Sequence, residues 1–166
     1  PGTALGTSGA IVSNGTSDDS DGLLWELATV NQAGRRRLAF NLRTDKGLEG
    51  IIAGDDDIAL DEWHFVVGVY TGSRMELYLD GEHVASGTHN GELLKELEGE
   101  EGKKGKKGKK EKGEAWIGGR NDDSEAHAFE GWIDEVVVFS EALTAEQIAE
   151  LYELRYPSIT VVAWHD

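Results

Sequence analysis

The sequence has no cysteine, only two prolines and no long hydrophobic run. The absence of cysteine excludes disulfides and thiolate metal sites. No apolar stretch approaches the roughly 20 residues that a membrane-spanning helix needs, so we predict no membrane span. Twenty-two glycines beside so few prolines indicate many tight turns. Together with several strand-like runs, they favour an all-β sandwich or barrel.

Positive charge is also scarce. The 16 Lys and Arg residues stand against 32 Asp and Glu residues, and the formal net charge is −16 at pH 7. This balance argues against nucleic acid as a partner. The lysines gather in one place, because residues 91–114 hold eight of them beside seven glutamates. The rest of the chain therefore carries nearly all of the excess acid.

The most repetitive part of the sequence is "GEEGKKGKKGKKEKGE", residues 99–114. Glycine entropy and repulsion between lysines both oppose ordered structure there. We predict a flexible insertion at about 99–114, placed in a loop between two strands. The alternative is a basic arm that reaches an acidic surface, either on a neighbouring copy or on an anionic glycan.

Alternating hydrophobic residues predict the strands. In "RRLAFNLRT", residues 36–44, the side chains of Leu38, Phe40 and Leu42 fall on one face. Further strands are expected at residues 23–30, 115–119, 130–140 and 158–166.

Two strand-like runs follow one another at residues 63–70 and 75–87. The second run contains an Asp80-Gly81 pair, which is the clearest hairpin signal in the sequence. This dipeptide supplies the positive φ angles that a tight two-residue hairpin turn requires. The alternating runs on both sides of the pair therefore predict antiparallel strands.

One short helix is expected in "ALTAEQIAELYELRY", residues 142–156. Thr144 can cap its first turn, and Gln147 can reach back to complete a capping box. Ile148, Leu151 and Tyr152 fall on one face at helical spacing. That apolar stripe predicts docking on the chain's own sheet, and a groove on a partner is the alternative.

Two blocks of sequence resemble a known family. "DEWHFVVGVYTGSRMELYLDGEHVASG", residues 61–87, resembles the middle of laminin G-like domains of the concanavalin A-like jelly-roll superfamily. "WIGGRNDDSEAHAFEGWIDEVVVFSEALTAEQIAELY", residues 116–152, is similar to the ending of those domains. The resemblance implies an all-β fold: a two-sheet antiparallel jelly-roll sandwich with one short C-terminal helix. We expect the sandwich to occupy residues 1–156.

The order of the strands departs from the family. Family members open with a strand resembling "FTVEAW", whereas this chain has its equivalent, "SITVVAWHD", at residues 158–166. Three explanations fit this rotated order. The chain is a circular permutant whose tail folds back, or one repeat cut from a tandem array, or a subunit that donates its tail to a neighbour. Donation repeated head to tail makes a filament, because such a contact does not close on itself.

The C-terminal strand, residues 157–166, is therefore the candidate interaction site. One set of alternating side chains, Ile159, Val161 and Ala163, or the other set, Val162 and Trp164, would fill the acceptor groove.

Calcium is the one cofactor that the sequence suggests. Asp18, Asp19 and Asp21 cluster in a glycine-rich loop, and hard cations take carboxylate and carbonyl oxygens as ligands. The resemblance adds Asp134, since members of the superfamily often hold a structural calcium at this aspartate. Asn14 begins an Asn-Gly-Thr sequon in a predicted loop and is a candidate glycosylation site.

No catalytic motif is found. The superfamily includes glycoside hydrolases with an alternating acidic motif on one strand, and that motif is absent. Trp25, Trp116 and Trp132 could form a platform for sugars, but alternating tryptophans in strands are more typical of a core.

The sequence therefore favours a non-catalytic, extracellular structural or adhesive β-sandwich subunit that polymerises head to tail by strand donation. A monomeric, calcium-dependent carbohydrate-binding module is the alternative. The expected partners are copies of the chain and extracellular glycans.

Overall fold

A computed structural model describes residues 9–15, 22–54, 58–59, 61–98, 110–120, 127–154 and 160–164. Most of these residues lie in strands. The elements in chain order are β1 (Ala10–Gly15), β2 (Leu23–Gln32), β3 (Arg35–Thr44), β4 (Gly47–Ile52), β5 (Val66–Tyr70), β6 (Arg74–Leu79), β7 (Glu82–Thr88), β8 (Glu96–Glu98), β9 (Lys110–Lys112), β10 (Glu114–Ile117), β11 (Val136–Phe139), α1 (Ala145–Glu153) and β12 (Thr160–Trp164).

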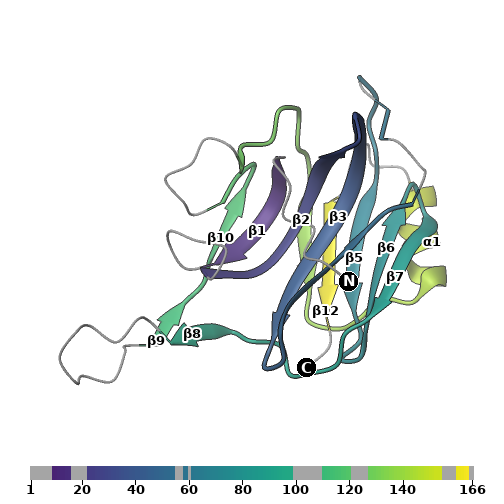
Figure 1. Ribbon diagram of the computed structural model, residues 1–166. Coiled ribbons are helices and arrows are strands. Elements are labelled where there is room, and N and C mark those ends of the chain that lie inside the picture. Colours follow the sequence, from purple (N-terminus) through teal and green to yellow (C-terminus); the bar gives the residue numbers. More distant parts are fainter. Residues whose placement is uncertain are drawn as a thin grey trace.

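The strands form two five-stranded sheets and a small ribbon. The first sheet has the order β10-β1-β2-β3-β4, and the second has the order β11-β12-β5-β6-β7. Figure 1 shows the ribbon of β8 and β9 projecting from the body, and α1 beside β6 and β7. The predicted all-β jelly-roll sandwich with one short helix is confirmed.

The core lies between the two sheets and follows the predicted alternation. Leu38, Phe40 and Leu42 of β3 are fully buried and pack against residues of the second sheet. Gly68 of β5 sits directly over the Phe40 ring, where an added Cβ would come within 3.0 Å of the ring carbons. Only glycine lets the two sheets approach this closely at that point.

The predicted turn at Asp80-Gly81 joins β6 to β7. The φ angles of Asp80 and Gly81 are 52° and 84°, as a two-residue hairpin with the right-handed twist of its strands requires. The Asp80 carboxylate accepts a hydrogen bond from the backbone N–H of Phe65 at 2.9 Å. The turn is thereby fixed to the segment that leads into β5.

Helix α1 begins as the sequence predicts. The Thr144 side chain accepts a hydrogen bond from the Gln147 backbone, and the Gln147 side chain accepts one from the Thr144 backbone. Ile148 is fully buried in a cluster with Phe65, Val67 and other residues on the outer face of the second sheet. The helix therefore docks on its own sheet, as expected.

Two elements begin or end at other residues than predicted. The strand expected over residues 130–140 begins only at Val136, since Glu135 has a φ angle of 48° that interrupts the extended backbone. Residues 110–112, inside the predicted insertion, form β9 and pair with β8. Most of the remaining insertion lies outside the described residues.

Candidate functional site

The C-terminal strand β12 lies inside the second sheet, between β11 and β5. Val161 pairs with Val137 of β11 on one side and with Val67 of β5 on the other. Both pairings are parallel, whereas the other strand pairs in the described residues are antiparallel. We call the gap between β5 and β11 the slot. It is filled by a strand that runs parallel to both of its neighbours.

The predicted donation residues fall partly on this strand. Val161, Val162, Ala163 and Trp164 belong to β12. Ile159 lies outside the described residues.

A cavity of about 710 Å³ opens at the end of the sandwich where β5 begins. Its apolar lining includes Ile11 of β1, Val66 of β5 and Phe129 from the segment before β11. Two tryptophans also line it, and both are unusually exposed: Trp63 by 54% and Trp132 by 87%. Large exposed indole rings beside a cavity mark a surface that a ligand or partner can cover.

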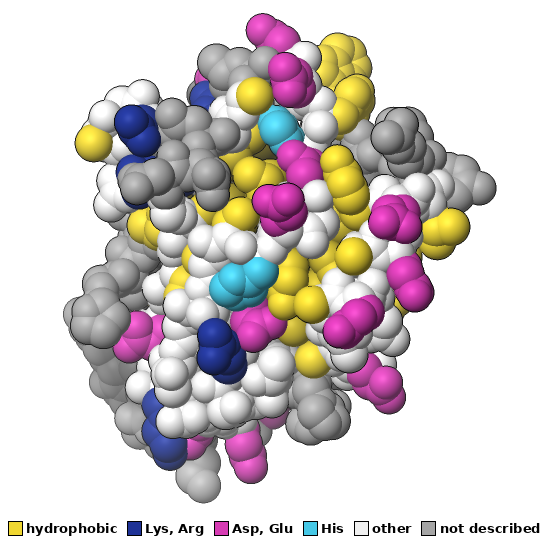
Figure 2. All heavy atoms as spheres, turned by 90° about the vertical axis from the view of Figure 1, so that its right-hand side faces the viewer, with side chains coloured by type: hydrophobic (Ala, Val, Ile, Leu, Met, Phe, Trp, Pro, Cys, Tyr) yellow, Lys and Arg dark blue, Asp and Glu magenta, His cyan; other side chains and the backbone are white. Residues whose placement is uncertain are grey.

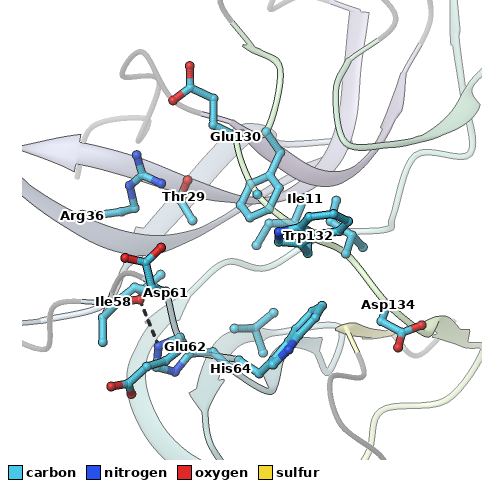
Figure 3. A pocket seen from close by; sticks show the side chains of 16 residues that line it. Ile11, Thr29, Arg36, Ile58, Asp61, Glu62, His64, Glu130, Trp132 and Asp134 are labelled. Carbon is cyan, nitrogen blue, oxygen red and sulfur yellow. Dashed lines mark hydrogen bonds between the residues drawn. The ribbon is translucent and has the colours of Figure 1, made fainter.

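Four acidic residues also line the cavity. Figure 3 shows Glu130, Asp61, Glu62 and Asp134 spread around the cavity, with Trp132 among them. The cationic side chain that lines the cavity is Arg36, and His64 also contributes to the wall. The cavity wall therefore holds more negative than positive formal charge.

His64 holds the wall in place. Its Nδ1 lies 2.8 Å from Asp80 Oδ2, and its Nε2 lies 3.2 Å from the carbonyl oxygen of Ala59. These contacts tie the segment before β5 to the β6–β7 turn and to the preceding loop. His64 has a structural role here, and the neighbouring Asp61, with a φ angle of 63°, gives the loop its sharp turn.

A buried ion pair lies on the first sheet. The Arg120 guanidinium donates two hydrogen bonds to the Glu26 carboxylate, each 2.5 Å long, and Asn41 Nδ2 donates a third at 3.0 Å. Glu26 is only 1% exposed. This pair fastens the segment that follows β10 onto β2 and β3.

The other side chains proposed from the sequence lie apart from one another. Asp134 lines the cavity, whereas Asp18, Asp19 and Asp21 lie outside the described residues. The described residues hold no group of three or more His, Asp or Glu side chains suited to a metal ion. Calcium binding thus stays a prediction.

Asn14 lies in a strand and not in the predicted loop. It belongs to β1 and pairs with Ala115 on one side and Trp25 on the other, because β1 continues to Gly15. Its side chain is half-buried. Glycosylation of Asn14 stays a prediction, and the residue lies in a strand.

The three tryptophans considered for a sugar platform also separate. Trp25 is buried in the core, as predicted, whereas Trp116 and Trp132 are exposed by 41% and 87%. The expectation that these two belong to the core is wrong. Trp116 is on β10, at the edge of its sheet, and Trp132 precedes β11 and belongs to no strand.

Sequence reasoning missed the cavity as a site. Its wall is built from segments near residues 11, 29, 36, 58–66 and 129–134, which no local pattern connects. The available signals were the runs "DEWH", residues 61–64, and "EGWID", residues 130–134, in each of which acids lie beside a tryptophan.

No helix among the described residues is long and apolar enough to cross a membrane. The sandwich and its closing helix define a β-sandwich of the jelly-roll class. A family model for the concanavalin A-like lectin/glucanases superfamily, Laminin_G_3, matches residues 1–149, and the chain therefore belongs to this laminin G-like family.

A comparison with curated proteins finds no match. Among solved structures, the chain is similar to part of an S-layer domain-containing protein from Clostridium thermocellum, at 22% identity and a TM-score of 0.42. The match covers 81% of this chain and 59% of the other, so the chain spans less than two thirds of that structure.

Proposed function

We propose that the chain is a non-catalytic structural subunit of an extracellular assembly, in which each copy gives β12 to the slot of its neighbour. The extracellular setting rests on the laminin G-like family. The observation that carries the proposal is the parallel pairing of β12 with both β5 and β11. Antiparallel pairing is slightly more stable per residue, so a strand entering the slot in the opposite direction would fit better.

The short connection after α1 explains the parallel direction. The ring of Tyr152, near the end of α1, lies 5.9 Å from the ring of Phe65, just before β5. The chain thus leaves the helix beside the start of β5, and Thr160 pairs with Val66 at that end. An antiparallel β12 would have to begin beside Tyr70, about 13 Å further along the slot. A neighbour's strand is free of this constraint.

The start of β1 supports the antiparallel direction for a donated strand. Ile11 of β1 and Val66 of β5 line the same cavity, so β1 and β5 begin at the same end of the sandwich. An antiparallel strand in the slot would end there, beside the acceptor's β1. This direction agrees with the sequence, in which the tail written before the head resembles the unbroken opening of the family.

Three chains test the proposal: the intact chain, a chain ending at Tyr156, and a permutant. The permutant carries residues 157–166 ahead of Pro1 and ends at Tyr156, so that its strand can enter its own slot antiparallel. We expect the intact chain to assemble with rising concentration in sedimentation velocity and to form filaments in negative-stain images. We expect the truncated chain and the permutant to stay monomeric, with the permutant the more stable of the two.

Two results would contradict strand donation. One is an intact chain that stays monomeric at millimolar concentration, with amide exchange showing β12 as protected as β5. The other is a permutant no more stable to denaturant than the truncated chain. The first result would assign the tail to its own sheet, and the second would show that an antiparallel strand does not fill the slot.

A further inference from the structure

We propose that the cavity at the start of β5 binds the lysine-rich segment, residues 102–112, of a second copy of the chain. This contact is separate from strand donation, since it uses another surface and another segment. Two observations point to a cationic occupant. The cavity wall carries the carboxylates of Asp61, Glu62, Glu130 and Asp134 with Arg36, and it presents two exposed tryptophans.

The chemistry of the wall selects lysine. Ammonium groups are attracted to the faces of indole rings and to carboxylates, and Trp is the best aromatic partner for a cation. Four carboxylates repel phosphate, sulfate and anionic glycans. A lysine side chain satisfies both parts of the wall, because its alkyl stem covers apolar surface while its charge stays near the acids.

The chain itself contains a segment of matching charge. Residues 102–112 hold seven lysines and one glutamate, while the whole chain has a net charge of −16. Figure 2 shows that acidic side chains are spread over the face that carries α1 and β7, with hydrophobic side chains between them. The lysine-rich segment is thus the strongly basic part of an otherwise acidic protein, and a second copy offers it complementary charge.

The positions of the two parts favour contact between copies over contact within one copy. The cavity includes Arg36 near the start of β3, whereas Leu93 bridges to Thr44 at the end of β3, just before β8. These two ends of β3 are about 26 Å apart at the rise of a strand. Figure 1 also shows the β8–β9 ribbon pointing away from the body.

The probe for this contact is a labelled peptide of residues 102–112, titrated into the intact chain at a concentration below assembly. We expect Trp132→Ala to weaken peptide binding about fivefold. We expect Asp61→Asn together with Glu130→Gln to weaken it about tenfold at low salt, and less in 0.5 M NaCl. Asn tolerates the positive φ angle at residue 61, so this variant keeps the loop.

Matched controls separate the cavity from general attraction to an acidic protein. Trp116→Ala removes an exposed tryptophan outside the cavity, and Glu82→Gln with Glu153→Gln removes two exposed acids elsewhere. Both controls should leave peptide binding within about twofold of the intact chain. Trp132→Phe should restore part of the affinity lost in Trp132→Ala, since a smaller aromatic face remains.

Two outcomes overturn the proposal. Equal losses in the cavity variants and the controls would assign the binding to the acidic surface as a whole. Binding of the neutral sugar cellohexaose that is lost in Trp132→Ala, with peptide binding unchanged, would assign the cavity to a glycan. Because the probe is a free peptide, neither outcome depends on whether β12 is donated, and failure of assembly would leave peptide binding as expected.

Discussion

The two sides of the sandwich differ in how far the chain covers its own hydrophobic strands. At the centre, Leu27 of β2, Phe40 of β3 and Leu77 of β6 are fully buried. At the side formed by the edge strands β10 and β11, Ile117 is 63% exposed and Val138 is 44% exposed. Both regions have strand sequences rich in apolar residues, but only the first is covered within one copy.

This difference shows which part of the sandwich buries its hydrophobic residues within one copy. The covered region is built from β2, β3, β5 and β6, which pair with strands adjacent in sequence, apart from the pairing of β5 with β12. The exposed region adjoins β12, the strand that pairs in parallel. We therefore expect substitutions to act on stability in the covered region and on assembly in the exposed one.

The largest effect should come from truncating the covered core. Phe40→Ala removes a fully buried ring and should lower the free energy of unfolding by about 3–5 kcal/mol. Val138→Ala, at the exposed edge, should cost less than about 1 kcal/mol in the monomer. Urea denaturation of both variants at low protein concentration measures the contrast. Equal losses would show that the edge is covered in solution within one copy.

A similar loss in the free energy of unfolding is expected at the ion pair between Arg120 and Glu26, which links the two regions. Arg120→Ala leaves the buried Glu26 carboxylate without its ion pair and should cost about 3–5 kcal/mol. The double variant Arg120→Ala with Glu26→Gln should recover part of that loss, because the unpaired charge is removed. A thermodynamic double-mutant cycle gives the coupling. Additive effects would contradict a direct interaction in solution.

A smaller effect is expected at the cap of α1. Thr144→Ala removes the acceptor for the Gln147 backbone N–H and should lower the free energy of unfolding by about 1 kcal/mol. Thr144→Ser keeps the hydroxyl and serves as the control. Thermal denaturation by circular dichroism measures both variants. A loss in the serine variant as large as in the alanine variant would remove the cap as the cause.

The smallest expected effect is on the pH dependence of stability, and it comes from His89. Burial lowers the pKa of His89 from its ordinary value of 6.5, and its Nε2 lies 3.1 Å from Thr44 Oγ1. The unfolded chain then binds the proton more readily, so the stability from neutral His89 is present above pH 6.5 and declines below it. His89→Gln should flatten this decline in denaturation curves between pH 5 and 7. An unchanged slope would assign the decline to other groups.

The sequence predicted the elements that depend on neighbouring residues. The Asp80-Gly81 turn and the Thr144 capping box need only a few adjacent positions, and both are confirmed. The alternation of Leu38, Phe40 and Leu42 gave the buried face of β3 for the same reason.

The remaining features depend on how distant segments meet. The direction of β12 follows from the place where α1 ends beside Phe65, which no pattern within residues 158–166 reveals. Trp132 lies outside any strand, because β11 begins only after Glu135, where a residue with no turn signature adopts a positive φ angle. The cavity forms only where the segments at residues 58–66 and 129–134, which carry its acids and tryptophans, meet each other and residues 11, 29 and 36.

The position of β12 inside the sheet also has a kinetic consequence. Four residue pairs join it to β11 and five join it to β5, so its departure breaks two ladders at once and detaches β11 from the sheet. Because both ladders must break together, a strand in the slot dissociates slowly and has a long residence time. A contact made this way would not dissociate during assembly. The length of a filament would then be set by the rate at which slots are filled.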